Sequence, residues 1–297
     1  MRLTELILHS NLPVRELSEA ESSKLKRTLL EMYKDIAFAC EKEGLTVFLG
    51  GGSCLGAVRH KGFIPWDDDI DLNMLRADYD RFPAALKKHF PEKYDLRGPG
   101  LSEDYLYQFI KIEKRGTLLK TIYDFEDEKP QVGIDLFPIE NIPDNKLSRL
   151  VFGFRNNLLN YIGLCVKLYL RRDCPFAKLI YSTKEGKKSL RRRFFVGQLF
   201  SFRNYKKWYG KGDRLAQKYK NRKTKCTSCP TGRKHFFGEI LELADIFPTS
   251  DCVFEGVPSK IYGGHIKYLS ALFGNYMQLP PPEKREKHFI VEMDLGK

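Results

Sequence analysis

The sequence predicts an α/β (α+β) fold in which helices flank a mixed sheet and a basic helical insertion is added to it. Two observations support this prediction. First, an apolar run at residues 46–49 stops at three consecutive glycines, a helix signal follows, and polar and apolar residues then alternate, which is the order strand, turn, helix, strand. Second, residues 105–112 and 132–138 are short and rich in β-branched and aromatic residues, whereas residues 147–225 are amphipathic and strongly basic.

Further elements are expected on both sides of these strands. Residues 21–43 and 77–89 carry apolar side chains at helical spacing. Towards the C-terminus, residues 237–247 and 253–258 predict short strands and residues 261–272 predict a helix.

The stretch from Phe48 to Asp71 combines glycines, a helix and acids. Ser53 is expected to cap a helix that runs to about His60 and leaves backbone N–H groups facing a phosphate. After Trp66, one face of the next strand is expected to carry four polar side chains, Asp67, Asp69, Asp71 and Asn73. Like charges this close repel each other, and a hard divalent cation such as Mg²⁺, bound through carboxylate oxygens, removes that cost.

The acidic run by itself could also be a solvated face, as runs of charged residues usually are. It is not a calcium loop, because Leu72 stands where such a loop requires glycine and Asp78 where it requires a bidentate glutamate. The glycines before it do not form a Walker loop, because no Gly-Lys-Ser/Thr follows them.

Residues 51–71 resemble the signature of the LicD family, phosphocholine transferases related to the fukutin group of sugar-alcohol phosphate transferases. The similarity extends to residues 133–138 and 276–288, and leaves the middle of the chain poorly matched. It implies a nucleotidyltransferase (polymerase-β-like) fold, in which a glycine-serine turn precedes a metal-binding pair of aspartates. With it we divide the chain into a nucleotidyltransferase-like catalytic core (1–145), a basic, aromatic-rich helical insertion (146–230) and a C-terminal part that closes the active site (231–297).

The resemblance also implies roles for individual residues. The metal, Mg²⁺ or Mn²⁺, would be held by Asp69, Asp71 and Asp135, and Asp135 or Asp67 would accept the proton of the attacking hydroxyl. The donor diphosphate would lie on backbone N–H groups of three residues, Gly51, Gly52 and Ser53. Its remaining charge would be met by four basic residues, Arg59, His60, Lys61 and Lys111. The alternatives are that Asp135 only pairs with a base and that Lys111 only extends to solvent.

The implied reaction is the transfer of phosphocholine or a similar group from CDP-choline, or a related CDP-alcohol, to a hydroxyl of a glycan. The acceptor would be a cell-surface glycan or its lipid-linked precursor, as in lipopolysaccharide or teichoic acid modification. His288 either donates to the substrate or is an ordinary surface histidine. The residues alone leave two other functions open: a nucleotidyltransferase that modifies RNA or protein, and a non-enzymatic basic binding module.

The net charge of +13 is concentrated in the middle of the chain, where residues 149–225 hold 22 Lys and Arg against 3 Asp and Glu. Basic residues mixed with aromatic ones suit an anionic membrane surface. The same composition also suits RNA binding, although no recognised RNA-binding motif is present and nucleic acid is not the expected partner. A solvated helical surface with ordinary charges is the other alternative.

Composition and cysteine usage indicate a globular cytoplasmic protein, which the basic segment could place at the inner face of the membrane. No apolar stretch is long enough to span a bilayer, and the N-terminus lacks the apolar core of a signal peptide. The seven cysteines are scattered, as in reduced cytosolic proteins. Cys226 and Cys229 form the only close pair and could supply half of a zinc site, with His235 or Cys252 completing it.

Overall fold

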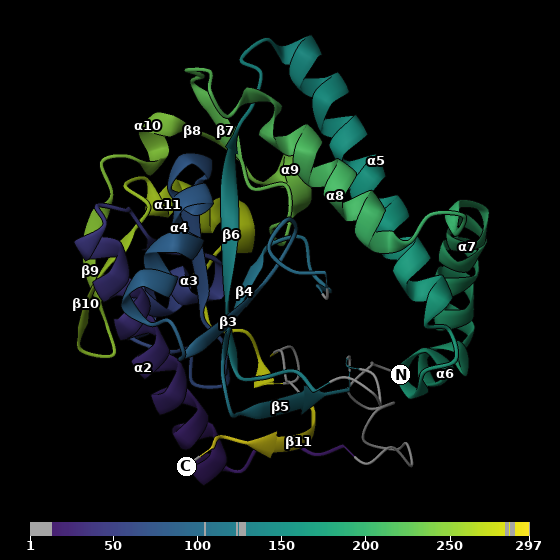
Figure 1. The fold of residues 1–297 in the computed structure, drawn as a ribbon, viewed down its shortest axis with the longest axis horizontal. Coiled ribbons are helices and arrows are strands. Elements are labelled where there is room, and N and C mark those ends of the chain that lie inside the picture. Colours follow the sequence, from purple (N-terminus) through teal and green to yellow (C-terminus); the bar gives the residue numbers. More distant parts are fainter. Residues whose placement is uncertain are drawn as a thin grey trace.

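The computed structural model describes residues 14–103, 105–122, 124, 129–282, 285 and 289–296. The predicted mixed sheet flanked by helices is confirmed (Figure 1). The main path of the central sheet has the order β1 (Phe48–Leu49), β2 (Asp71–Leu75), β6 (Gly133–Asn141), β4 (Ile110–Lys114) and β3 (Tyr94–Arg97). The β2–β6 pair is parallel and the other pairs are antiparallel. The far end of β6 also pairs with β7 (Cys226–Ser228), which pairs with β8 (Ile240–Glu242).

Two groups of helices lie on opposite sides of β6 in Figure 1. To its left lie α2 (Glu19–Lys42), α3 (Gly51–His60) and α4 (Arg76–His89). To its right lie the helices of the basic insertion, α5 (Lys146–Leu170), α6 (Pro175–Tyr181), α7 (Lys184–Phe200) and α8 (Tyr205–Ala216). No helix in the described part of the chain is long and apolar enough to cross a membrane.

The C-terminal third is built from short elements. The 3₁₀ helix η1 (Gln217–Tyr219) leads to the β7–β8 pair, and the later elements are α9 (His235–Gly238), α10 (Leu243–Ile246), β9 (Ser250–Phe254), β10 (Val257–Ile261) and α11 (His265–Phe273). Near the C-terminus, β11 (Ile290–Asp294) pairs with β5 (Leu118–Thr121).

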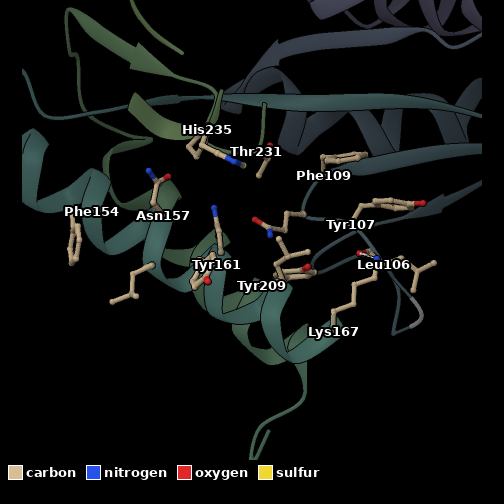
Figure 2. Close-up of a pocket in the computed structure, with 15 residues that line it drawn as sticks. Leu106, Tyr107, Phe109, Phe154, Asn157, Tyr161, Lys167, Tyr209, Thr231 and His235 are labelled. Carbon is tan, nitrogen blue, oxygen red and sulfur yellow. Dashed lines mark hydrogen bonds between the residues drawn. The ribbon is translucent and has the colours of Figure 1, made fainter. Parts of the chain in front are cut away.

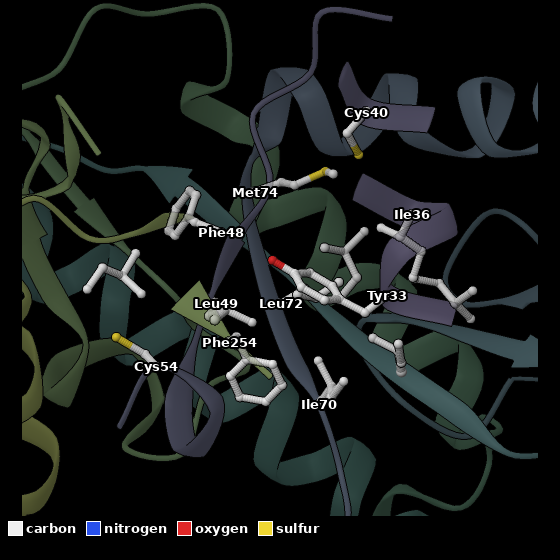
Figure 3. Close-up of a cluster of buried hydrophobic side chains, with 14 of the residues drawn as sticks. Tyr33, Ile36, Cys40, Phe48, Leu49, Cys54, Ile70, Leu72, Met74 and Phe254 are labelled. Carbon is white, nitrogen blue, oxygen red and sulfur yellow. The ribbon is translucent and has the colours of Figure 1, made fainter. Parts of the chain in front are cut away.

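The main core lies between α2 and the sheet (Figure 3). Helix α2 begins at a capping box in which Ser18 and Glu21 bond each other's backbone N–H groups. Its apolar face is fully buried through side chains at helical spacing, including Leu25, Leu29, Met32 and Ile36. Ile70, Leu72 and Met74 point into the same core, which confirms the predicted alternation from Ile70 onward.

The C-terminal third contributes to this same core, through Phe254, Ile261, Tyr262, Tyr268 and Leu269. The helical insertion has a smaller cluster of its own, in which Trp208 and Tyr209 of α8 pack on Ile162 and Val166 of α5. The division of the chain into three parts stays a prediction.

Three predicted strands are shorter than expected. Within residues 237–247, only Ile240–Glu242 is a strand, between the short helices α9 and α10. The acidic strand begins only at Asp71, and residues 67–70 form no regular strand. The strand predicted from residue 105 begins at Ile110, and the preceding residues 106–109 line a cavity instead of pairing. Residues 106–109 resemble a strand in composition but shape a cavity instead.

Candidate active site

The glycine turn brings the start of α3 against the acidic side chains. The Gly50 N–H donates to the Asp71 carbonyl oxygen over 2.9 Å. A Cβ on Gly51, whose φ is +44°, would lie 2.7 Å from Oδ2 of Asp71, and a Cβ on Gly52 would lie 3.0 Å from Oδ2 of Asp67. Only glycine leaves room for both carboxylates beside the backbone here.

Ser53 has a different role from the one predicted. The helix begins at Gly51 with Gly50 as its N-cap, so Ser53 lies inside the first turn and does not cap it. Its buried hydroxyl instead accepts a hydrogen bond of 2.9 Å from the Asp71 N–H. The prediction failed because a serine in this position can accept a hydrogen bond from a neighbouring strand as well as from its own helix. Ser53 therefore fixes the strand that carries Asp71 against α3.

Two neighbouring strands bring the predicted carboxylates together. Asp71 on β2 and Asp135 on β6 are partners in the parallel register. Lys111 on β4 is opposite Asp135 in the antiparallel register, and its Nζ lies 2.8 Å from Asp135 Oδ1. Adjacent strands thus place a row of three charged side chains across the sheet.

The electrostatics of this cluster favour an added positive charge. Burial, followed by repulsion from Asp71 and the other nearby carboxylates, raises the pKa of Asp69 well above its ordinary value. Burial and repulsion from Asp135 and Asp67 raise the pKa of Asp71 to about 8, although Lys111 acts in the opposite direction. Burial lowers the pKa of Lys111, but the attraction of Asp135 outweighs it, and the pKa is raised. One lysine therefore does not neutralise the cluster.

The donor atoms available here suit a hard divalent cation, since all are carboxylate oxygens. Within the described ranges, however, no three His, Cys, Asp or Glu side chains are arranged to hold a metal ion, and Asp135 is bonded to Lys111. This is the pairing that the sequence left open as the alternative for Asp135. A role for Asp135 as third ligand remains a proposal.

The predicted basic residues at the end of α3 lie apart from the glycines. Roughly 12 Å of helix separates Gly52 from His60. Arg59 donates to the carbonyl oxygen of Tyr276 over 2.7 Å and to His60 Nε2 over 2.9 Å. Of the four basic candidates, the structure therefore brings only Lys111 to the acidic cluster. His288 lies outside the described residues.

A cavity of about 330 Å³ opens onto the glycines and Asp71. Its wall includes residues that the sequence did not single out for the site, among them Phe109, Phe137, Thr231, Arg233, Glu239 and Tyr268. The Tyr268 hydroxyl accepts a hydrogen bond of 2.9 Å from the Gly51 N–H, so one of the N–H groups predicted to hold a phosphate already has a partner. Most of these residues come from the C-terminal third, and no local pattern connects them with the acidic run.

A second cavity, of about 600 Å³, adjoins the first and shares Phe109, Thr231 and His235 with it (Figure 2). It lies between α5 and residues 106–109 and is lined largely by aromatic and aliphatic side chains. The Nζ atoms of Lys111 and Lys167 lie 5.3 and 5.1 Å from the ring centre of Tyr107. Lys111 therefore connects this aromatic cavity with the acidic cluster.

The close cysteine pair does not form half of a zinc site in the described residues. Cys226 Sγ accepts a hydrogen bond of 2.7 Å from Arg149 Nη1. Cys229 is buried beside the first cavity, and burial raises its pKa well above the ordinary value.

Replacing Gly51 with alanine tests the close approach of Asp71. We expect the free energy of unfolding to fall by about 1–3 kcal/mol more than in Gly44→Ala, because the new methyl group meets the Asp71 carboxylate. Gly44 is a matched control, since its φ is +62° and a Cβ there would meet nothing within 4 Å. Urea unfolding of both variants measures the difference, and equal losses would show that backbone strain alone is responsible.

Comparison with known proteins gives matches that centre on this site. Residues 44–157, which include the glycine turn, the acidic run, Lys111 and Asp135, match the family described as LicD/FKTN/FKRP, nucleotidyltransferase domain. The lipopolysaccharide cholinephosphotransferase LicD of Haemophilus influenzae is 26% identical over 271 residues, which are 85% of this chain and 90% of that protein.

Two further relatives match shorter segments. The human ribitol 5-phosphate transferase FKRP is 42% identical over 52 residues, 18% of this chain and 10% of that protein. An uncharacterised protein of Rickettsia prowazekii is 37% identical over 90 residues, 30% of this chain and 32% of that protein. The matched proteins that are named for an activity are phosphotransferases. The resemblance predicted from the sequence is confirmed: residues 44–157 are similar to the nucleotidyltransferase domain of the LicD/FKTN/FKRP family.

Proposed function

We propose that this protein is a Mg²⁺-dependent phosphotransferase that moves a substituted phosphate from a CDP-linked alcohol to a hydroxyl of a cell-surface glycan or its precursor. The observation that carries the proposal is the carboxylate cluster, which lies against the glycine start of α3 and opens into a cavity. The activities for which the H. influenzae and human relatives are named support it. We place the reaction in the cytoplasm, at the inner face of the membrane.

In the proposed site, Asp69 and Asp71 would hold Mg²⁺ and Asp135 would complete the set. The bound ion would supply positive charge where negative charge develops during transfer. The raised pKa values of Asp69 and Asp71 support this assignment, because burial and the repulsion of neighbouring carboxylates disfavour the charged forms that a cation would stabilise. The residues of the site then act mainly by positioning and by electrostatics.

The acceptor hydroxyl attacks the phosphorus that carries the alcohol, the bond from that phosphorus to the bridging oxygen breaks, and CMP leaves. Asp67 or Asp135 accepts the hydroxyl proton. Gly51 and Gly52 line the cavity and give the diphosphate a wall without side chains. Lys111 lies beside Asp135, where its ammonium group can also meet phosphate charge.

The test is release of CMP from CDP-choline, measured with Mg²⁺ and with excess chelator. We expect release only with the metal. If CDP-choline is inert, CDP-ethanolamine, CDP-glycerol and CDP-ribitol are measured next, and release from one of these would change the group transferred and keep the reaction class. Inert results with all four donors, together with incorporation of labelled nucleotide into RNA or protein, would replace this proposal with a nucleotidyltransferase.

A further inference from the structure

Helix α5 carries an apolar stripe on its exposed face. The stripe runs at helical spacing through Leu147, Leu150, Val151, Phe154 and Leu158, all of them exposed. The exposed Leu164 lies further along the helix, to one side of the stripe. Leu147 is 70% exposed and Phe154 is 63% exposed. At 1.5 Å per residue the stripe is roughly 16 Å long. Scattered exposed leucines are ordinary, but an ordered stripe of this length on one helix marks an interaction surface.

The charged residues of α5 itself are all basic. Helix α5 contains no Asp or Glu, and its four charged residues are Lys146, Arg149, Arg155 and Lys167. Helix α7 packs beside it, with Gly197 so close to α5 that a Cβ would lie 2.3 Å from the Cys165 carbonyl oxygen. The surface of α7 has a hollow of about 660 Å³ lined by two aromatic residues and four bases, Tyr181, Phe195, Lys187, Lys188, Arg191 and Arg192.

The stripe is continuous with the aromatic cavity next to the candidate active site. Phe154 and Leu158 belong both to the stripe and to the lining of the 600 Å³ cavity, which Leu164 also lines (Figure 2). On its inner side that cavity shares Phe109 and His235 with the cavity that contains Asp71. An apolar path therefore leads from the outer face of α5 to the carboxylates.

We propose that α5 and α7 form a docking surface for an anionic phospholipid bilayer, and that the aromatic cavity receives a lipid-linked acceptor from that bilayer. Apolar side chains enter the interface while the surrounding bases contact lipid phosphates, and the combination of the two signals gives stable association. This inference rests on the proposed function for the identity of the acceptor. Docking itself is a property of α5 and α7 and does not depend on catalysis.

The test is co-sedimentation of the full chain with vesicles of phosphatidylcholine alone and of phosphatidylcholine mixed with phosphatidylglycerol, without donor or acceptor. We expect binding to the mixed vesicles, weakened by salt. Val151→Asp is expected to weaken this binding by about tenfold or more, because it removes apolar contact and adds a repelled charge. Val253→Asp on β9 is the matched control, since Val151 and Val253 are 53% and 48% exposed, and it should bind as the unmodified protein does.

A second variant separates the charge from the apolar contact. Arg191→Gln together with Arg192→Gln is expected to lower binding to the anionic vesicles by about fivefold for each charge removed, with little effect on phosphatidylcholine vesicles. Thermal unfolding checks that each variant is folded.

Three outcomes would overturn the proposal: no vesicle binding by the unmodified protein, equal losses in Val151→Asp and Val253→Asp, or a dimer in solution that Val151→Asp dissociates. The last result would assign the stripe to a second copy of the chain. Because vesicle binding is measured without substrates, loss of docking with normal CMP release is distinguishable from failure of the proposed function.

Discussion

Asp71→Asn is expected to lower metal-dependent CMP release by at least about a thousandfold. The substitution keeps the shape of the side chain and removes the carboxylate that lies between the glycine turn and Asp135. Asp68→Asn, in the same acidic run, is the matched control and should retain most of the activity, since Asp68 has no role in the proposed site. Steady-state rates with saturating CDP-choline measure both. Comparable activity in Asp71→Asn and the unmodified protein would remove Asp71 from the site.

The same variant should change how stability depends on pH. The folded pKa of Asp71, about 8, is above the unfolded value, so between about pH 4 and pH 8 the folded protein binds the extra proton. Without metal, this group therefore makes the unmodified protein less stable as pH rises through that window, by up to about 1.4 kcal/mol per pH unit. Asp71→Asn removes this contribution, so its free energy of unfolding, measured by chemical unfolding, should depend less on pH over this range.

Mg²⁺ supplies a readout of the site that needs no substrate. At pH 8 the ion is expected to raise the thermal midpoint of the unmodified protein, since a ligand that binds only the folded state stabilises it. Asp71→Asn should show a much smaller rise, and Asp68→Asn a rise close to that of the unmodified protein. An equal rise in all three would place the ion elsewhere.

Local patterns predicted the parts of this site that a single segment or one strand pairing creates. Glycines before a helix, followed by alternating apolar residues, led to the correct placement of Asp71 beside α3. The resemblance placed Asp135 beside Asp71, and β2 and β6 do carry the two residues in register. The role of Asp135 as a metal ligand stays a prediction. Helix α2 was predicted from the helical spacing of its apolar residues alone.

The rest of the site depends on packing between distant segments. Tyr268 reaches Gly51 across 217 positions in the chain, and nothing in either segment indicates this contact. Arg233 and Glu239 line the cavity because β7 and β8 extend the sheet at the end of β6. The resemblance also implied that Arg59, His60 and Lys61 meet the phosphate charge, whereas the length of α3 carries them away from the glycines.

Arg76→Met is expected to have the largest effect on stability, a loss of about 3–5 kcal/mol, because it leaves Glu140 buried without its cation. Arg76 on α4 is 5% exposed and Glu140 on β6 is 0% exposed. Two nitrogens of the guanidinium, Nε and Nη2, donate to Glu140 Oε1, and Nη2 also lies 2.9 Å from Asp213 Oδ1 on α8. One arginine therefore joins the sheet, α4 and the helical insertion.

The stability lost in Arg76→Met should depend on pH and be smaller in acid. Burial already raises the pKa of Glu140, against the attraction of Arg76. Without the arginine that pKa rises further, so the folded variant gains a proton that the unfolded chain lacks at neutral pH. The destabilisation should therefore be smaller near pH 5 than at pH 8, as measured by urea unfolding at both pH values.

Two further variants show whether the buried charge is the cause. Arg81→Met lies on the same helix at a position that is 59% exposed and 3.6 Å from Asp78, and it should cost less than about 1 kcal/mol. Arg76→Met combined with Glu140→Leu removes both buried charges and should recover most of the lost stability. If the double variant is as unstable as Arg76→Met alone, the stability is lost through packing between α4 and α8. Arg76 would then act through its aliphatic stem and through its guanidinium, whose Cζ lies 4.7 Å from the ring centre of Tyr79. Recovery in the double variant would show instead that the charge of Glu140 makes Arg76 indispensable.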